Sequence, residues 1–276
     1  MNYIFINIGD TPDYLKYSLN SVLSVDKDAK IIIATDKKTD FKNVIPVNLN
    51  DIRSSLTSQL IENEIYKNTN LDNNKLWLRS LLRVFYLYDV IDSLGINSAV
   101  HFDSDVLIYK PFIELKDNFI NNKLNITPLN SNLLVFGYSY INNKEVLFKI
   151  NNHLLNEVKL TKSNEMHLMS IVSKQNPNLF NELRIFPNPD SKLIFDPASY
   201  GQYISGIHKK PYRFYRKRFI TEAHPIGEKI KNKDLKVKFK NSPFVVSDKK
   251  LYEIANLHIH SKELKKFLPE NYKEIV

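Results

Sequence analysis

Two aspartates stand two positions apart in AVHFDSDVLIYKPF, residues 99–112, at the point where an apolar run stops. Side chains at i and i+2 of an extended segment point to the same side, so Asp103 and Asp105 can face one ion. Without a cation, two close and partly buried carboxylates would repel each other. A hard cation such as Mg²⁺ or Mn²⁺ prefers oxygen ligands and, held by two carboxylates, keeps positions open for phosphate oxygens. The pair therefore indicates a metal site at which a diphosphate could leave.

The Asp-x-Asp pattern alone is weak evidence, because a chain with 17 aspartates in 276 residues produces about one match by chance. A second match, Asp26 and Asp28, lies in a polar stretch with lysines on both sides, and we expect it on the surface. Asp103 and Asp105 differ because they follow AVHF, a predicted buried strand, at the edge where open α/β sheets place their ligands. The alternative for this pair is a solvated turn at the end of a strand.

The chain begins with a strand, a helix and a second strand. YIFINI (3–8) and KIIIA (30–34) are short β-rich runs, and the segment 11–24 between them has helical spacing. Thr11 is a predicted N-cap, and Pro12 suits the first helical position. This β-α-β order favours a parallel sheet with helices packed on it.

The later elements continue this alternation. KLWLRSLLRVFYLYDVIDSL (75–94) predicts a long helix that Gly95 ends. No repeat or Gly/Ser linker divides the chain, so we expect one α/β domain over 1–276 with a C-terminal extension. The other predicted elements are a helix near 51–66, strands at 99–102, at 132–140 and near 234–247, and helices at 143–157 and 163–174.

Composition excludes several classes of protein. With 43% hydrophobic residues the chain can bury a sizeable core, and no window approaches the ~18 consecutive apolar residues of a membrane span. The apolar N-terminal run is cut by Gly9 and Asp10, which indicates a core strand and not a signal peptide. The absence of cysteine excludes disulfides, thiolate catalysis and zinc–cysteine sites, and it is compatible with a reducing cytosol. We therefore expect a cytoplasmic protein.

Positive charge dominates, with a formal net charge of +9. Nucleic acid, an acidic membrane surface or a phosphorylated small molecule would each fit this excess. It is strongest in HKKPYRFYRKRF (208–219), where lysines and arginines interleave with aromatic residues. This segment is either a solvated basic face or a contact with an anionic acceptor or the inner face of a membrane.

A family resemblance is carried by RSLLRVFYLYDVI (79–91), AVHFDSDVLIYKPF (99–112) and LNSNLLVFG (129–137). These segments resemble the nucleotide-sugar glycosyltransferases of the GT-A fold, in particular the glycogenin and galactinol-synthase type and related polysaccharide-building enzymes. The likeness runs in order through 1–140, and ANLHIHSK (255–262) adds a C-terminal anchor. It implies a Rossmann-like α/β fold with a mixed, mainly parallel sheet, helices on both faces and a C-terminal extension that closes the active site.

The resemblance implies a metal-dependent enzyme that moves a sugar from a nucleoside diphosphate, with UDP expected, to a hydroxyl of a glycan or lipid-linked glycan. In these families the DxD motif, here Asp103 and Asp105, binds Mn²⁺ or Mg²⁺ and the diphosphate of the donor. Residues 1–140 would then form the half that binds the nucleotide-sugar. Residues 141–276 would bind the acceptor and supply the C-terminal metal and phosphate segment.

The C-terminal anchor offers two histidines. In a strand, Leu257 and Ile259 would point into the core and leave His258 and His260 on the opposite face. Many enzymes of this family complete the metal site with a late histidine and follow it with a lysine that contacts the diphosphate. Either histidine matches the first role, and Lys262 matches the second. The longer H-x-x-G-x-x-K-P-W ending of the family is absent here.

Other positions match the family by their place in the sequence. Glu165, near a helix start that Ser163 is expected to cap, lies where inverting members keep a general base and retaining members orient acceptor or donor. Helix capping alone would also explain this glutamate. Asp196, the second catalytic candidate, and Gln202 could bind the sugar, although a helix start explains them structurally. In the Asn-Ser-Gly region that contacts the donor sugar, Asn132 replaces the glycine. The implied nucleotide and sugar contacts are Asn7, Gly9, Asp10, Asp36, Arg79, Arg83, Ser104, Asn130 and Ser131.

Two other functions compete with this interpretation. A sugar nucleotidyltransferase on a similar fold needs a glycine-rich signature after the first strand, and NIGDTPDY has a single glycine. A basic nucleic-acid or anion-binding protein built on 208–219 would leave Asp103, Asp105 and the His-x-His segment unexplained, so nucleic acid is not an expected partner. The sugar, the acceptor and the choice between inversion and retention stay open, because pocket shape decides them.

Overall fold

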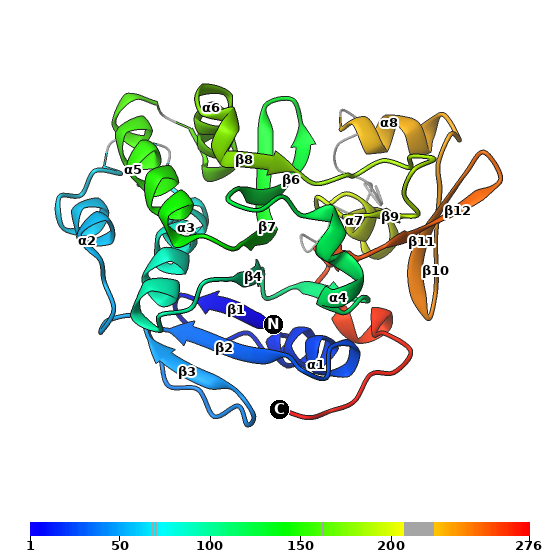
Figure 1. Cartoon of the computed structure of the whole chain (residues 1–276), viewed down its shortest axis with the longest axis horizontal. Helices are drawn as coiled ribbons and strands as arrows, with labels where there is room; N and C mark the ends of the chain where they lie inside the picture. The colour runs from blue at the N-terminus through cyan, green and yellow to red at the C-terminus, as the bar shows by residue number, and fades with distance from the viewer. Residues whose placement is uncertain (68, 70, 162, 207–223) are drawn as a thin grey trace, which may run out of the picture.

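The computed structural model describes residues 1–276 except 68, 70, 162 and 207–223. In sheet order, the seven strands of the central sheet are β3 (Ile45–Asn48), β2 (Lys30–Thr35), β1 (Asn2–Asn7), β4 (Ala99–Phe102), β7 (Leu133–Ile141), β6 (Leu124–Asn130) and β8 (Phe180–Glu182) (Figure 1). Four of the six neighbouring pairs are parallel, and β7 is antiparallel to both β4 and β6. The predicted mixed, mainly parallel sheet is confirmed.

Helices cover both faces of this sheet. On one face, α1 (Leu15–Val25) packs in a core that contains Tyr3 and Phe5 of β1. Ile4 and Ile6 of the same strand enter a separate core on the other face, because successive side chains of a strand point to opposite sides. The helices of that second face are α2 (Ser55–Glu62), α3 (Lys75–Ser93, as predicted), α5 (Lys144–Leu160) and α6 (Glu165–Gln175).

The starts of two helices differ from the sequence predictions. α1 begins at Leu15, whose backbone N–H donates to the carbonyl oxygen of Pro12 at 2.9 Å. A turn therefore precedes the helix, and Thr11 is not its N-cap. Asn164, and not Ser163, caps α6, because its side-chain oxygen accepts a hydrogen bond from the backbone N–H of the third helical residue.

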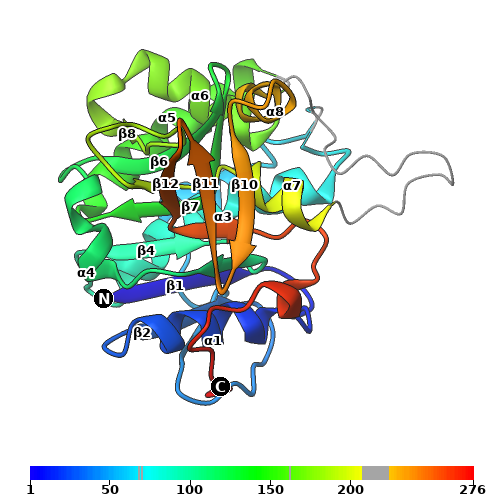
Figure 2. The same ribbon diagram turned by 90° about the vertical axis from the view of Figure 1, so that its right-hand side faces the viewer.

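The C-terminal part of the chain forms a second sheet and then contributes one strand of a separate two-stranded sheet (Figure 2). In sheet order its strands are β10 (Lys236–Lys240), β11 (Ser242–Ser247), β12 (Lys250–Ile254) and β9 (Leu193–Ile194). The next strand, β13 (Asn256–His258), leaves this sheet and pairs antiparallel with β5 (Val106–Ile108). This pairing lays the C-terminal extension beside the segment that carries Asp103 and Asp105.

The short helices are α4 (Phe112–Leu115), α7 (Tyr200–Ser205) and α8 (Pro225–Lys231), and 3-10 turns cover Lys116–Asn118, Pro177–Leu179 and Leu264–Phe267.

The basic segment 208–219 lies outside the described residues, so its predicted contact with a membrane surface stays a prediction. Of the helices that the structure describes, none combines the length and the apolar character that crossing a bilayer requires.

The second Asp-x-Asp match corrects the sequence analysis. Asp28 is exposed as expected, but Asp26 is buried with 9% of its surface exposed. Its carboxylate accepts a hydrogen bond from the hydroxyl of Tyr3 at 2.5 Å and another from the backbone N–H of Phe112 at 3.2 Å. The neighbouring lysines predicted a surface position, because the sequence does not show that the segment after α1 contacts β1 and α4.

Replacing Asp26 by alanine should lower the free energy of unfolding by about 1–3 kcal/mol, because Tyr3 and the Phe112 N–H lose their buried acceptor. Urea unfolding followed by circular dichroism measures this change. Asp28→Ala, two residues away on the surface, is the matched control and should change stability by less than about 0.5 kcal/mol. Equal effects of the two substitutions would contradict the structural role of Asp26.

Candidate active site

The paired aspartates lie in a tight turn between β4 and β5. The four residues of β4 are buried, and the backbone N–H of Asp103 donates to the carbonyl oxygen of Gly137 in β7 at 3.1 Å. The carbonyl oxygen of Asp103 then accepts a hydrogen bond from the Val106 N–H at 3.0 Å, which reverses the chain into β5. The side chains of Asp103 and Asp105 remain 13% and 6% exposed at this edge of the sheet.

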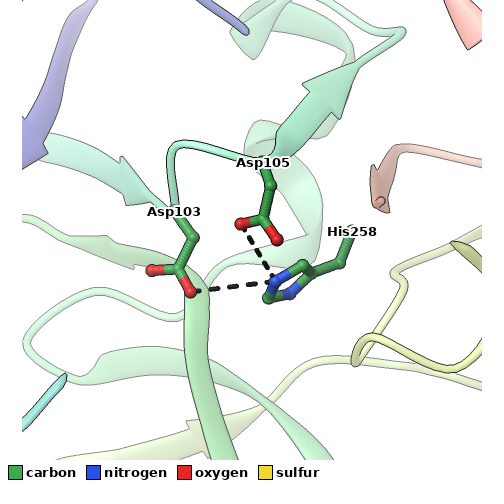
Figure 3. A group of neighbouring side chains, drawn as sticks. All are labelled: Asp103, Asp105 and His258. Carbon is green, nitrogen blue, oxygen red and sulfur yellow. Dashed lines mark ion pairs between the residues drawn. The ribbon is translucent and has the colours of Figure 1, made fainter. Parts of the chain in front are cut away.

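His258 of β13 completes a group of three side chains around one point (Figure 3). Its Nε2 lies 3.2 Å from Asp105 Oδ1 and 3.8 Å from Asp103 Oδ2. One ligand atom from each residue lies within 4.8 Å of the other two, and the described part of the chain holds no other group of this kind. Two carboxylates and one imidazole form a donor set that suits a divalent ion.

Because Gly137 has no side chain, there is room beside this group of three residues. A Cβ at Gly137 would lie 3.0 Å from the imidazole of His258 and 3.3 Å from Asp103 Oδ2. A side chain here would therefore crowd two of the three candidate ligands. The residues present fit an ion of this class.

His260 does not belong to the group, although its ring centroid lies 4.8 Å from that of His258. Burial, together with the positive charge of His258, lowers the pKa of His260 to about 4, so this side chain is neutral. Its Nε2 has no hydrogen-bond partner among the described residues. The sequence left two histidines open, and the structure brings only His258 to the carboxylates.

Each carboxylate also contacts a cation of the chain. Arg83 Nη1 of α3 lies 2.6 Å from Asp103 Oδ1. The ammonium of Lys262 donates a hydrogen bond to Asp105 Oδ2 and lies 5.5 Å from the ring centroid of Tyr14. The charge of the acidic pair is therefore balanced by side chains that lie far apart in the sequence.

These contacts change the pKa values of the central groups. Burial by itself would raise the pKa of Asp105, but the charges and hydrogen bonds of His258 and Lys262 outweigh it and hold this pKa well below its ordinary value. Burial would lower the pKa of His258, but Asp105 and Asp103 outweigh burial and raise it. The two carboxylates therefore favour the protonated imidazole of His258, and a metal ion would bind only its deprotonated form.

The predicted nucleoside positions after β1 also meet. The backbone N–H of Gly9 donates to Asp36 Oδ1 at 2.7 Å, and the side-chain amide of Asn7 donates to the Gly9 carbonyl at 3.0 Å. Gly9 has φ +94°, and a Cβ there would lie 3.0 Å from Arg79 Nη2. Asn7, Gly9, Asp36 and Arg79 thus form one polar cluster drawn from three segments of the chain, while Asp10 beside it is exposed.

Asn130 and Ser131 lie at the turn between β6 and β7 and not beside the aspartates. Their turn, with Asn164 and His167 of the α6 start, lines an open depression of about 680 Å³. The first residue of β7 is four residues from Gly137, which corresponds to roughly 13 Å of strand. Ser104 is half-buried between the two aspartates. Contact of Asn130 and Ser131 with a donor sugar remains a prediction.

Glu165 is the first residue of α6 and is only 4% exposed. Burial raises its pKa to about 8, while the nearby charge of Arg83 acts in the opposite direction and that of Asp103 in the same direction. The charge of Arg83 therefore acts on both Asp103 and Glu165.

Asp196 contacts backbone groups rather than open space. Its Oδ1 accepts hydrogen bonds from the N–H groups of Ser199 and Tyr200 at 2.7 and 2.8 Å, and its Oδ2 accepts from Gly201 and His258 at 2.8 and 3.0 Å. With 2% exposure, this carboxylate joins the start of α7 to β13 and so positions His258. Gln202 of the same helix is also buried. The structure therefore supplies a structural explanation for Asp196, and its catalytic assignment remains a prediction.

Gly201, which was not among the predicted site residues, allows this close approach. A Cβ at Gly201 would lie 2.2 Å from the carbonyl oxygen of His258, a distance that backbone atoms cannot accept. Gly137 and Tyr14 were missed as well. The chain contains only six glycines, and this scarcity was the signal that could have drawn attention to Gly137 and Gly201.

No family model matches the sequence, and no curated protein matches it either. Among solved structures, the chain is similar to mouse xyloside xylosyltransferase 1, with 12% identity and a TM-score of 0.46 over 67% of this chain and 86% of that one. It is also similar to the galactosyltransferase LgtC in complex with donor and acceptor sugar analogs, with 13% identity and a TM-score of 0.47 over 94% and 87%. For GlyE of Streptococcus pneumoniae the values are 14% and 0.45, over 67% of this chain and 45% of that one. These structures are glycosyltransferases, but identities and TM-scores this low assign no activity to this chain.

The pKa of Glu165 predicts a pH-dependent stability. A carboxyl whose pKa in the folded state is about 8, above its ordinary value of 4.5, stabilises the fold below pH 4.5 and loses this contribution as the pH rises toward 8. The difference in stability between Glu165→Gln and the wild type should therefore shift in favour of the variant between pH 6 and pH 9. Thermal unfolding across this range measures the difference.

Glu145→Gln is the matched control, because Glu145 also lies in the first turn of a helix but is exposed. Its pH profile should follow that of the wild type. If Glu165→Gln also followed the wild type, the raised pKa of Glu165 would be wrong.

Proposed function

We propose that this protein is a metal-dependent glycosyltransferase of the GT-A type, which transfers a sugar from a nucleoside diphosphate, with UDP expected, to a hydroxyl of a glycan acceptor. The observation that supports it is the group of Asp103, Asp105 and His258 at the end of β4, with Arg83 and Lys262 beside it. A sheet edge with paired acids and adjacent cations suits a ligand that binds through a metal and carries negative charge of its own.

Asp103, Asp105 and His258 would hold the ion. When bound, the ion would neutralise the charge that develops on the departing diphosphate. The imidazole nitrogen shifts the preference of the site from Mg²⁺ toward a transition metal such as Mn²⁺, because Mg²⁺ prefers oxygen ligands.

Lys262 and Arg83 would change partners when donor and metal bind. In the structure each pairs with one carboxylate, and an ion on those carboxylates would displace both side chains. The diphosphate of the donor would be their new partner, because it would place negative charge beside the bound ion. The polar cluster of Asn7, Gly9 and Asp36 would hold the nucleoside, with 1–140 as the donor half of the chain and 141–276 as the acceptor half.

Glu165 would orient the acceptor or take the proton from its hydroxyl. With a pKa of about 8, this carboxyl is mostly protonated at neutral pH, so a role as general base would make activity rise with pH through about 8. A retaining enzyme would lack this dependence on Glu165. The pH profile of Glu165→Gln therefore bears on stereochemistry.

Nucleotide binding tests the proposed function. Wild-type protein should be stabilised against heat by one of UDP, GDP and CMP only when Mn²⁺ is present, and Asp105→Ala should lose this effect. Asp28→Ala, at an exposed aspartate outside the group of candidate ligands, should behave like the wild type. A protein that no nucleotide stabilises, with or without Mn²⁺, would contradict a donor site at these residues.

The Lys262→Met substitution tests separately the contact of Lys262 with Asp105 and its proposed contact with the diphosphate. Without nucleotide, Mn²⁺ should bind the variant about tenfold more tightly, because Asp105 no longer has a competing charged hydrogen bond. With Mn²⁺ present, the nucleotide should bind the variant more weakly, because the diphosphate loses a cation. Isothermal titration calorimetry gives both affinities.

Lys266→Met is the control for this experiment, since Lys266 is exposed and pairs with Glu263 on the surface. Neither affinity should change in this variant. Two affinities that move in the same direction in Lys262→Met would overturn the exchange of partners.

A further inference from the structure

The four-stranded sheet β10-β11-β12-β9 has one buried and one outward side (Figure 2). Val237 and Val245 lie side by side on the inner face, where they pack in the core that also contains Leu257 and Ile259. Tyr252, opposite Val245, is buried as well. The alternate residues of the same strands must then point away from the protein.

Three lysines of β10 lie on that outer face. Lys236, Lys238 and Lys240 occupy every second position of the strand, and all three are exposed. No acidic residue interrupts the row within β10. Because β10 is the edge of its sheet, the row forms one border of the outer face.

Apolar side chains lie directly beside the lysines. Val246 is opposite Lys236, and Leu251 of β12 is opposite Val246, so these three form one row across the sheet. Phe244 is opposite Lys238 in the next row. Leu251 is 52% exposed, and Val246 and Phe244 are partly exposed.

The one acid on this face within β10, β11 and β12 already has a partner. Glu253 is opposite Phe244, and Lys110 Nζ lies 2.9 Å from its carboxylate. The turn between β11 and β12 contributes Asp248, with Lys249 and Lys250 beside it. The face therefore presents a net positive charge together with exposed apolar groups.

We propose that this outer face, defined by Lys236, Lys238, Lys240, Phe244, Val246 and Leu251, docks on an anionic lipid surface. Lysines can extend their apolar stems and keep their ammonium groups at the phosphate level, while leucine, valine and phenylalanine enter the boundary with the acyl chains. Negative charge at a cytoplasmic lipid surface attracts such a lysine row. Lysines on an edge strand also prevent pairing with other strands, but that role does not require an exposed leucine beside them. The proposal does not depend on the transfer reaction.

Sedimentation with vesicles tests this surface in the full chain. Vesicles of phosphatidylcholine with about 30% phosphatidylglycerol should bind the wild type, and vesicles of phosphatidylcholine alone should not. Replacing Lys236, Lys238 and Lys240 together by glutamine should reduce binding about tenfold or more. Leu251→Ser should reduce it as well, at unchanged net charge.

A triple substitution of Lys27, Lys42 and Lys149 by glutamine is the matched control. These lysines are exposed on other parts of the surface, and their replacement removes the same net charge. This variant should bind like the wild type, and circular dichroism should show that all variants are folded.

Three results would overturn the proposal. The first is equal loss of binding in both triple variants, which would indicate net charge alone. The second is binding that survives in the β10 variant but disappears when the basic residues of 208–219 are replaced. The third is unchanged binding in Leu251→Ser together with competition by inorganic polyphosphate, which would point to an acidic polymer in place of a lipid surface.

Discussion

Asp103 and Asp105 hold two negative charges close together at a sheet edge that is mostly closed to water. Their oxygens approach within 4.8 Å, and at the effective dielectric of a protein such charges repel by about 3 kcal/mol. Arg83 from α3 and Lys262 from the C-terminal segment offset this repulsion, and so does the imidazole of His258, whose pKa the two carboxylates raise. The surrounding fold brings these three basic side chains, from distant parts of the sequence, to one place.

The link between β5 and β13 is what makes this possible. A short antiparallel pairing places His258 opposite Val106, next to the acidic turn. Asp196 then fixes the backbone of His258 from the other side, and the missing side chain of Gly201 lets α7 approach. Buried polar groups must be paired, so a carboxylate with four backbone donors is well suited to join two segments.

Much of the fold could be predicted because it depends on local patterns. β1, β2, β4 and β7 are apolar runs buried on both faces, and α3 has clear helical spacing between Asn74 and Gly95. Alternation predicted correctly that Leu257 and Ile259 are buried. The burial of Asp26 and the late start of α1 could not be predicted, because they depend on contacts with distant residues such as Phe112 and on a turn at Pro12.

The sequence predicted the type of site, a metal site, but not every residue that forms it. The spacing of Asp103 and Asp105 indicated an ion, while the choice between His258 and His260 depended on the register of β13 against β5. The same limit applied to Asp196, whose role follows from four backbone donors that no sequence pattern reveals.

The central claim is that Asp103, Asp105 and His258 hold one divalent ion. Pulsed electron paramagnetic resonance of bound Mn²⁺ tests it most directly, because a coordinated histidine nitrogen modulates the signal. Nitrogen modulation is expected in the wild type and in His260→Ala, and it should be lost in His258→Ala. Mn²⁺ that fails to bind, or modulation that disappears in His260→Ala and persists in His258→Ala, would contradict it.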